Sequence, residues 1–438
     1  MSVNVKTFYQ ATNPGKALFT DNQEIEEKYY IDFSSVRGGK IIEDLKDNIA
    51  MWSPDEPTCQ LFTGHIGCGK STELWLLKQL LEAEGFHVVY FESDKDLEMG
   101  DLDVSDILLT IARQVSESLN TREKLNLDEP RRFKSIIEGA IKLLQTEIEI
   151  SPEVELSFGI AKITAQAKAS PQLRSKLRDY LGPRSNGIIE TINQELLEPA
   201  HKKLKQRGKN GLVVIVDNLD KVDSSPKPWG RPQPEYLFVD RGEQLASLHC
   251  HVIYTLPLAL RFSNDFNTLT QRFKSDPQVL PMVSIQLRDG KEFGEGMAKL
   301  RQLVLARAFP HLEEQQRLEK ITEIFDSTET LDYLCKMSGG HVRNILRILN
   351  DAIKKQKGLP ISSENLNKVI QNFRNERTLA VEDEEWELLR QVAQTQKVKG
   401  DDGYQRLIRS MFVYEYRDDE GSWFDINPIL KDSVELKK

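Results

Sequence analysis

The chain is poor in the features that mark secreted, membrane and disulfide-stabilised proteins. It has four cysteines in 438 residues, with no CxxC pair and no Cys/His cluster, so neither a disulfide framework nor a structural zinc site is expected. No run of about 18 apolar residues occurs, so no transmembrane helix is predicted. The first residues lack the apolar core of a secretory signal. These features predict a cytoplasmic protein that does not contact a membrane.

A basic excess is also missing. The chain carries 59 Lys and Arg against 68 Asp and Glu, a formal net charge of −9. Proteins that bind nucleic acid usually show a basic excess, at least locally, so a DNA-binding function would require a local basic patch. Hydrophobic residues make up 39% and charged residues 29%, which is typical of a folded globular chain. At roughly 100–200 residues per domain, the length predicts about two to four domains.

Short apolar runs that alternate with helical patterns predict an α/β fold with a parallel sheet. The run in residues 211–220 is nearly continuous Val and Ile, which fits a central strand buried on both faces. Residues 292–377 show only helical patterns. Two alternating strands around a glycine-containing turn follow, which indicates a winged-helix module. Further strands are expected at 58–64, 87–92, 251–257 and 282–287, and helices at 70–84 and 104–119.

The predicted domain organisation has four parts and one insertion. Residues 120–207 are longer than a simple connection needs, and Val154, Leu156, Phe158 and Ile160 alternate there with polar residues or glycine, which predicts a half-buried strand. This insertion is either a solvated decoration of the fold or a functional element. The four parts are an extended N-terminal arm (1–33), a P-loop α/β domain (34–290), a helical lid (291–378) and a winged-helix domain (379–438).

The most specific motif is GHIGCGKS, which fits G-x-x-x-x-G-K-[ST] between a predicted strand and a predicted helix. Its glycines let backbone N–H groups turn toward phosphate oxygens, and the helix start adds partial positive charge. The lysine supplies a charge to the β- and γ-phosphates, and the serine hydroxyl is suited to Mg²⁺. The predicted nucleotide-binding residues here are Gly64, His65, Ile66, Gly67, Cys68, Gly69, Lys70, Ser71 and Thr72.

A second motif, VVIVDNLD, supplies the acid that a P-loop protein needs at the end of a neighbouring strand. Asp217 follows four β-branched residues and is predicted to hold Mg²⁺ together with Ser71. Asn218 stands where active P-loop ATPases often carry a water-polarising glutamate, and an asparagine cannot accept that proton. Asp220 either substitutes as the base or only caps the following helix. Slow ATP hydrolysis is therefore expected.

Beyond these motifs, the chain resembles the AAA+-type P-loop ATPases, closest to the branch shared by the STAND signalling ATPases and the origin-recognition ATPases. SSVRGGKIIEDL resembles the segment that cups the adenine in that branch, with Val36 and Arg37 in the matching places. SGGHVRNILRIL resembles the sensor-2 helix of the lid, with Arg343 in the sensing role. The resemblance also places Thr255 at sensor 1 and Arg272, in QRF, at the arginine finger.

These residue types suit the roles that the resemblance implies. A transferring phosphoryl group spreads negative charge over its oxygens, so arginines directed at it stabilise that charge. Each residue also has a purely structural explanation. Arg343 could be a surface arginine of an amphipathic helix, Arg272 a solvated charge at a helix end, and Thr255 a β-branched strand residue.

The C-terminal module is acidic. Residues 380–438 contain 14 acidic and 9 basic side chains, and the predicted wing reads Arg417, Asp418, Asp419, Glu420. A DNA-binding wing presents Lys or Arg to phosphates, so these acids favour docking on a protein or on the chain itself. Arg406 and Arg409 in the preceding helix are the basic residues that favour DNA.

The sequence therefore predicts an ATP-dependent molecular switch that uses ATP and Mg²⁺. The resemblance implies homo-oligomers on activation and, by analogy, a separate effector protein, as in bacterial conflict, defence or signalling systems. No repeat of 20–50 residues and no second catalytic motif occurs. The alternative is a DNA-handling AAA+ ATPase of the origin-binding or transposition type, whose winged helix binds DNA. A small-molecule kinase does not fit the chain length or the sensor-2 helix.

Overall fold

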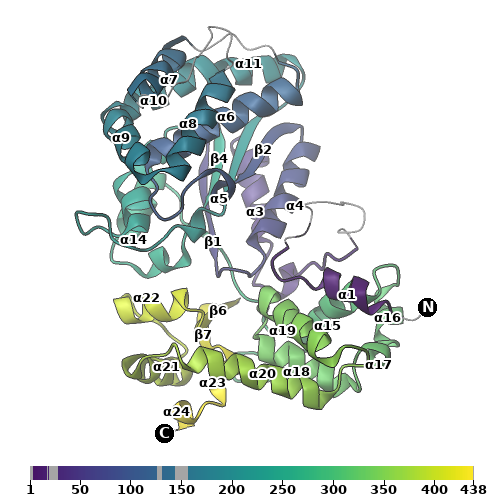
Figure 1. Cartoon of the computed structure of the whole chain (residues 1–438). Helices are drawn as coiled ribbons and strands as arrows, with labels where there is room; N and C mark the ends of the chain where they lie inside the picture. Colours follow the sequence, from purple (N-terminus) through teal and green to yellow (C-terminus); the bar gives the residue numbers. More distant parts are fainter. Residues whose placement is uncertain (1–2, 17, 19–27, 126–130, 144–155, 438) are drawn as a thin grey trace. The chain divides into compact units, whose positions relative to one another are not determined.

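The computed structural model describes residues 3–16, 18, 28–125, 131–143 and 156–437 (Figure 1). The chain forms two compact units. We call Met1–Ile41, Gly64–Thr72 and Val279–Lys438 the lid unit, and Ile42–Thr63 and Glu73–Gln278 the sheet unit. The P-loop residues thus belong to the lid unit, although the strand before them belongs to the sheet unit. The four-part division expected from the sequence stays a prediction.

A five-stranded sheet with the order β2-β3-β4-β1-β5 confirms the predicted α/β class. The pairs β2·β3, β3·β4 and β4·β1 are parallel. All seven residues of β3 are buried, as expected of a Val/Ile strand with neighbours on both sides. The strands are β1 (Cys59–Gly64), β2 (Phe86–Glu92), β3 (Gly211–Asp217), β4 (His251–Thr255) and β5 (Gln278–Leu280).

The strand predicted at 282–287 is not formed. The short strand β5 ends before it, and the backbone N–H groups of Met282 and Ser284 donate instead to the carbonyls of Glu415 and Val36, at 2.9 and 3.0 Å. Both acceptors lie in the lid unit, so the apolar alternation reflects burial in that unit rather than a place in a sheet.

Helices cover the sheet and continue into the insertion. They are α3 (Ile41–Asp47), η2 (Asn48–Trp52), α4 (Lys70–Ala83), α5 (Ser93–Asp96), α6 (Val104–Thr121), α7 (Arg131–Leu143), α8 (Leu156–Ala169), α9 (Pro171–Leu181), η3 (Gly182–Arg184), α10 (Ser185–Ile192), η4 (Asn193–Leu197), α11 (Glu198–Gln206), η5 (Leu219–Lys221), α12 (Gln233–Glu235), η6 (Tyr236–Asp240), α13 (Gly242–Leu245), η7 (Leu258–Phe262) and α14 (Phe266–Phe273).

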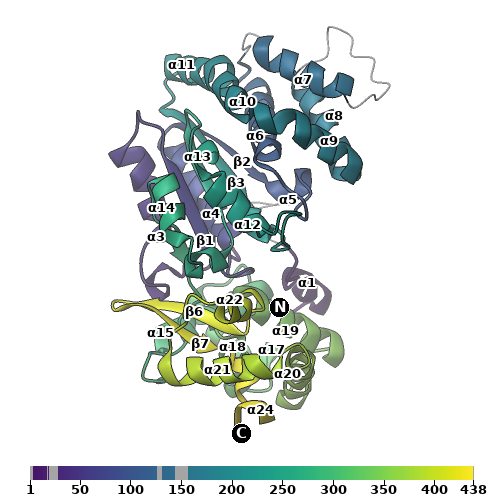
Figure 2. The same cartoon turned by 90° about the vertical axis from the view of Figure 1, so that its left-hand side faces the viewer.

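The insertion is helical where it is described, so the strand predicted around residues 154–160 is wrong. Val154 lies outside the described residues, and α8 begins at Leu156. Ile160, Ile163 and Ala167 are buried in the core of the sheet unit, at the three- and four-residue spacing of a helix face. Figure 2 shows α7 to α11 gathered in one bundle. The alternation of four apolar residues over positions 154–160 was too short to exclude a helix.

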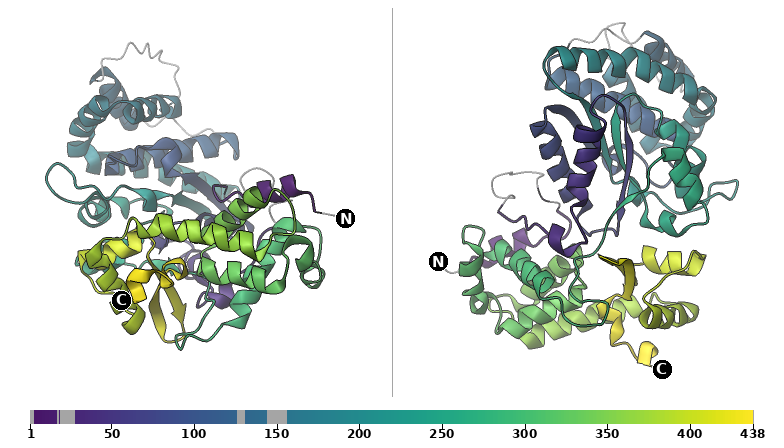
Figure 3. Two further views of the ribbon diagram at one scale, coloured as in Figure 1. Left: turned by 60° about the horizontal axis from the view of Figure 1, so that its bottom comes forward. Right: turned by 180° about the vertical axis from the view of Figure 1, so that it is seen from behind.

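The lid unit is a set of helices with a two-stranded hairpin. The hairpin strands β6 (Val413–Asp418) and β7 (Gly421–Ile426) pair antiparallel, which confirms the predicted wing. Figure 3 shows this hairpin and the helices around it from two further sides. The helices are α1 (Val5–Ala11), η1 (Ser34–Val36), α15 (Gly294–Ala308), α16 (Glu314–Leu318), α17 (Ile321–Ile324), α18 (Thr328–Ser338), α19 (Val342–Gln356), α20 (Ser363–Thr378), α21 (Asp383–Thr395), α22 (Asp402–Arg409), α23 (Pro428–Lys431) and α24 (Val434–Lys437).

The N-terminal arm is helical rather than extended over its first described part. Asn4 caps α1 by accepting a hydrogen bond from the N–H of Thr7 at 3.1 Å, and Phe8 is buried in the core of the lid unit. In the described ranges of the chain, no helix combines the length and the apolar character that a bilayer crossing requires.

Candidate nucleotide-binding site

The P-loop lies between the end of β1 at Gly64 and the start of α4 at Lys70. Gly67 and Gly69 adopt φ values of +87° and +113°, which side-chain-bearing residues rarely adopt. The Nζ of Lys70 donates to the carbonyls of Gly64 and His65 at 2.8 and 2.9 Å, so the ammonium group is held against its own loop. Ser71 and Thr72 are partly exposed in the first turn of α4.

These residues fit a nucleotide phosphate chain. The positive φ values let the loop present N–H groups to an anion, and a 14-residue helix adds its N-terminal dipole. The ammonium group of Lys70 is buried to 6% exposure, where a counter-charge is stabilising. Mg²⁺ commonly takes one or two protein oxygen ligands, for which a serine hydroxyl and a carboxylate are suitable.

The lid helix α19 approaches the P-loop through two hydrogen bonds. The N–H of Arg343 donates to the carbonyl of Gly67 at 3.1 Å, and the Nε2 of His341 donates to the carbonyl of Ile66 at 2.8 Å. The Nδ1 of His341 accepts the N–H of Asn344 at 3.0 Å, which fixes the tautomer. Burial lowers the pKa of His341 to about 3, so the ring is neutral near pH 7. Arg343 makes this hydrogen bond to Gly67 through its backbone N–H and not through its guanidinium group.

The wing also contacts the P-loop. The N–H of Glu415 in β6 donates to the Nε2 of His65 at 2.9 Å. The ring of Tyr414 lies 5.8 Å from the rings of both His65 and His341, edge-on to the first and stacked on the second. The hydroxyl of Tyr414 accepts a hydrogen bond from the Nδ2 of Asn344 at 2.7 Å. We call His65, His341, Tyr414 and Glu415 the P-loop latch.

The latch contacts are made by buried neutral groups, namely the two imidazole rings, the phenol ring of Tyr414 and the backbone N–H of Glu415. Burial lowers the pKa of His65 well below its usual value, with the nearby His341 and Lys70 acting in the same direction. Because its Nε2 accepts a hydrogen bond, the neutral His65 carries its proton on Nδ1. A neutral, buried contact of this kind depends on geometry and is only weakly screened by salt.

The segment predicted to cup the adenine contacts the loop from another side. The guanidinium of Arg37 donates from Nη2 to the carbonyl of Cys68 at 2.6 Å and lies 5.2 Å from the ring centroid of Phe33. Val36 is buried, and its carbonyl accepts the N–H of Ser284 at 3.0 Å. Arg37 thereby braces the P-loop, and its role toward adenine stays a prediction.

In the sheet unit, Asp217 ends β3 and is fully buried. Its Oδ2 accepts the hydroxyl of Tyr90 at 2.8 Å, and its Oδ1 accepts the N–H of Asn218 at 2.7 Å. The Oγ1 of Thr255 accepts the N–H of Leu219 at 2.9 Å, so this hydroxyl holds the turn that follows β3. These contacts position Asp217 rigidly at the carboxyl end of its strand.

The remaining predicted residues also lie in the sheet unit. Asp220 is buried in η5, and Arg272, in the last turn of α14, forms an ion pair with Glu243. The predicted set therefore falls into two groups. The P-loop, Arg37 and Arg343 are together in the lid unit, whereas Asp217, Asp220, Thr255 and Arg272 belong to the sheet unit. The magnesium pairing of Ser71 with Asp217 stays a prediction.

Sequence reasoning missed the latch partners of the P-loop. His341 was visible only as part of the sensor-2 motif, and its position directly before α19 is a helix-cap signal. In the sequence, Tyr414 and Glu415 were visible only as part of an alternating pattern that predicts a strand. Their contact with His65 spans about 350 positions of the chain, and no local pattern reports such a pairing.

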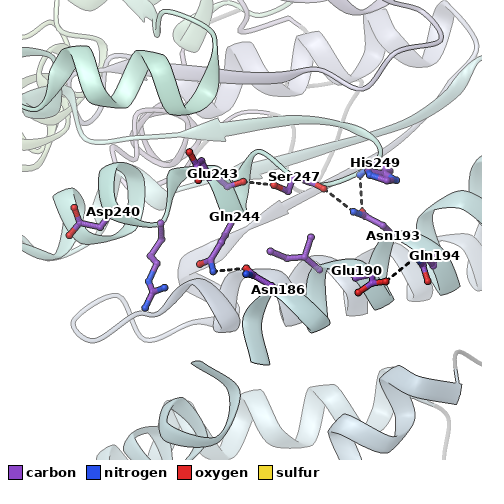
Figure 4. Close-up of a pocket in the computed structure, with 11 residues that line it drawn as sticks. Asn186, Glu190, Asn193, Gln194, Asp240, Glu243, Gln244, Ser247 and His249 are labelled. Atoms are coloured by element: carbon purple, nitrogen blue, oxygen red, sulfur yellow. Dashed lines mark hydrogen bonds between the residues drawn. The ribbon is translucent and has the colours of Figure 1, made fainter. Parts of the chain in front are cut away.

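A separate hollow of about 570 Å³ lies in the sheet unit, between α10 and the segment around α13 (Figure 4). Its amides are engaged in joining these segments. The Nδ2 of Asn193 donates to the carbonyl of Ser247 at 2.8 Å, its Oδ1 accepts the N–H of His249 at 2.9 Å, and the Nε2 of Gln244 donates to Asn186 at 3.0 Å. None of the predicted site residues lines this hollow, and we assign it no ligand.

No family model matches the chain, and no curated protein matches it. Solved structures do. Cdc6p from Pyrobaculum aerophilum matches at 12% identity and a TM-score of 0.39, over 100% of this chain and 98% of that one. The Aeropyrum pernix ORC2 protein matches at 12% and 0.40, over 98% and 96%. The A. pernix ORC1 protein in complex with DNA matches at 11% and 0.35, over 91% and 92%.

Proposed function

We propose that the chain is an ATP-binding and ATP-hydrolysing switch of the AAA+ type, in which the winged helix senses the state of the P-loop. The observation that carries this proposal is the latch. One P-loop residue, His65, accepts a hydrogen bond from the wing, and the neighbouring carbonyls of Ile66 and Gly67 accept hydrogen bonds from the lid. A change in the P-loop that accompanies nucleotide binding would alter both contacts.

Each residue of the site has a role in this proposal. Lys70 and the loop amides bind the phosphates, and Ser71 and Asp217 hold Mg²⁺, which neutralises phosphate charge when it is bound. Thr255 keeps the turn after Asp217 in place. Arg343 and Arg272 are the arginines proposed to stabilise the charge of the transferring phosphoryl group.

The wing acids are already engaged within the lid unit. The guanidinium of Arg288 donates to the carboxylate of Asp418 at 2.6 and 2.9 Å and to the carbonyl of Gly421 at 2.9 Å. Such a bidentate pair is stronger and more directional than a single contact. It supports intramolecular docking of the wing.

The experiment uses the thermodynamic coupling between the nucleotide site and the latch. If the latch responds to the nucleotide, breaking it must change the relative affinities for ATP and ADP. Calorimetry on His65→Ala should show the ATP/ADP affinity ratio altered at least about threefold. His249→Ala is the matched control, because it removes a histidine that lies outside the P-loop and whose side chain is 54% exposed. Equal ratios in both variants and the wild type would refute the coupling.

DNA handling is the second function to test. The DNA named with the A. pernix ORC1 structure belongs to that protein, but α22 of this chain carries Arg406, 49% exposed, and Arg409 in its last turn. Two arginines provide fewer contacts than the six to ten phosphate contacts of a firm nonspecific binder. The described residues offer no observation in favour of a separate effector protein or a defence system, and neither is proposed.

The full chain with ATP is expected to bind labelled duplex DNA with a dissociation constant weaker than roughly 1 μM at about 150 mM salt, measured by fluorescence anisotropy. Tighter binding that weakens in Arg406→Ala or Arg409→Ala, but not in Arg390→Ala on α21, would make DNA handling the leading function.

A further inference from the structure

Asn218, which follows Asp217 at the carboxyl end of β3, lies close to two carboxylates. Asn218 adopts the left-handed conformation, with φ of +66°. Its Nδ2 donates to the Oδ1 of Asp94 at 2.8 Å and lies 3.5 Å from the Oε2 of Glu92, at the long limit of a hydrogen bond. The amide is therefore turned toward the end of β2, where two carboxylates lie.

The strand register places Glu92 beside the proposed metal-binding acid. In the parallel pair β2·β3, Glu92 is the partner of Asp217, so the two side chains lie on the same face of the sheet. Tyr90, two residues earlier on β2, already contacts Asp217 through its hydroxyl. The end of β2 thus contributes to the same edge as the end of β3.

The two carboxylates at this edge are not equivalent. Both oxygens of Asp94 are engaged at 2.8 Å, Oδ1 by Asn218 and Oδ2 by the Nζ of Lys221. Glu92 has looser partners, namely Asn218 at 3.5 Å and the Nζ of Lys95 at 3.1 Å, and the Lys95 side chain is 70% exposed. Glu92 is 21% exposed, so a water molecule can reach it.

We propose that Glu92 is the general base of ATP hydrolysis, the proton acceptor that Asn218 cannot be. A water molecule held at the amide oxygen of Asn218 attacks the γ-phosphorus and gives its proton to the carboxylate of Glu92. The bond between the γ-phosphorus and the bridging oxygen breaks, and that oxygen leaves on ADP with the bonding electron pair. The assignment rests on the proposed ATPase function and deepens it.

Asp220, the other acid suggested by the sequence, is a less suitable base. It is buried to 8% exposure within the short turn η5, three residues beyond Asp217. The amide of Asn218, which marks the water-polarising position, is turned toward β2 instead. Of Glu92 and Asp220, Glu92 is therefore the acid whose contact with the Asn218 side chain is observed.

The test compares binding with chemistry in the full chain. Glu92→Gln should bind ATP with wild-type affinity in calorimetry and lose at least about a hundredfold in single-turnover hydrolysis, the usual contribution of a general base. Asp94→Asn and Asp220→Asn are matched controls and should each lose less than about tenfold.

The outcomes separate this assignment from the function on which it rests. Hydrolysis by Glu92→Gln within threefold of the wild type, or an equal loss in Asp220→Asn, overturns the role of Glu92 and leaves ATP binding intact. A wild-type chain that does not bind ATP overturns the proposed function itself, and the base with it.

Discussion

The ammonium group of Lys70 is hydrogen-bonded to its own P-loop. Its positive charge therefore lies at the loop that is proposed to bind the phosphates. Replacing Lys70 with alanine removes this charge and the two hydrogen bonds to the Gly64 and His65 carbonyls. Lys70→Ala should weaken ATP binding at least about tenfold, roughly 1.4 kcal/mol, by calorimetry. Lys78→Ala, on the same helix and paired with Glu82 at 3.0 Å, should have no such effect. Unchanged affinity in Lys70→Ala would contradict the site.

Substitution of Gly67 by alanine tests how closely the lid helix α19 approaches the P-loop. A Cβ added to it would lie 2.8 Å from the Cβ of Arg343 and 3.0 Å from the ring of His341, in addition to the strain of its positive φ. Gly208 has a similar φ of +78° with no atom within 4 Å of its added Cβ, so it isolates the strain alone.

Gly67→Ala should therefore lower the melting temperature more than Gly208→Ala, for which left-handed strain of about 1–2 kcal/mol is the main cost. It should also weaken ATP binding, whereas Gly208→Ala should not. Equal melting temperatures for the two variants would show that the lid does not approach the loop this closely.

The start of helix α6 carries a buried carboxyl pair. Asp103 and Asp106 form a capping box, in which the Oδ2 of Asp106 accepts the N–H of Asp103 at 2.9 Å. Burial, and then the charge of Asp103, raise the pKa of Asp106 to about 7, above its ordinary value of 3.8. The stability that this group contributes is therefore fully present below about pH 4 and is lost as the pH rises through 7.

Asp106→Asn should remove this pH dependence while keeping an acceptor for the cap. We expect the variant to gain melting temperature over the wild type between pH 6 and 8, by about 2–4 °C for each kcal/mol. Asp44→Asn, an exposed carboxylate in the first turn of α3, serves as the control. A difference between Asp106→Asn and wild type that does not change with pH would disprove the shifted ionisation.

Elements with a strong local sequence pattern were predicted correctly, whereas elements whose structure depends on distant partners were not. The P-loop strand, the Val/Ile strand β3 and the capped helix α6 were predictable, because composition and capping are local signals. The segment 282–287 alternates apolar and polar side chains from Val283 onward, yet its N–H groups donate to residues 36, 291, 340 and 415 rather than to a neighbouring strand. The latch and the orientation of Asn218 depend on the same kind of long-range contact, so neither could be predicted.

At the scale of the whole molecule, turnover is expected to be slow and to depend on assembly. The proposed arginine finger, Arg272, is ion-paired with Glu243 inside its own sheet unit. While that pair is closed, the transferring phosphoryl group lacks the positive charge that this arginine would supply. We expect basal turnover below about 1 s⁻¹, the low edge of typical enzyme rates. If Arg272 acts on a neighbouring copy, turnover per chain should rise with protein concentration, and Arg272→Ala should abolish that rise while Arg261→Ala retains it. Fast turnover in a dilute, monomeric sample would contradict this account.

The proposed switch requires that the nucleotide state of the P-loop reaches the wing through the latch. Hydrogen exchange at residues 412–416 tests it most directly, because the N–H of Glu415 is bonded to His65 and exchanges only when that contact opens. ATP should change the exchange rate at these residues at least about tenfold in the wild type, whereas Lys70→Ala should show no response. Identical exchange with and without ATP, in a chain shown by calorimetry to bind it, would contradict the switch.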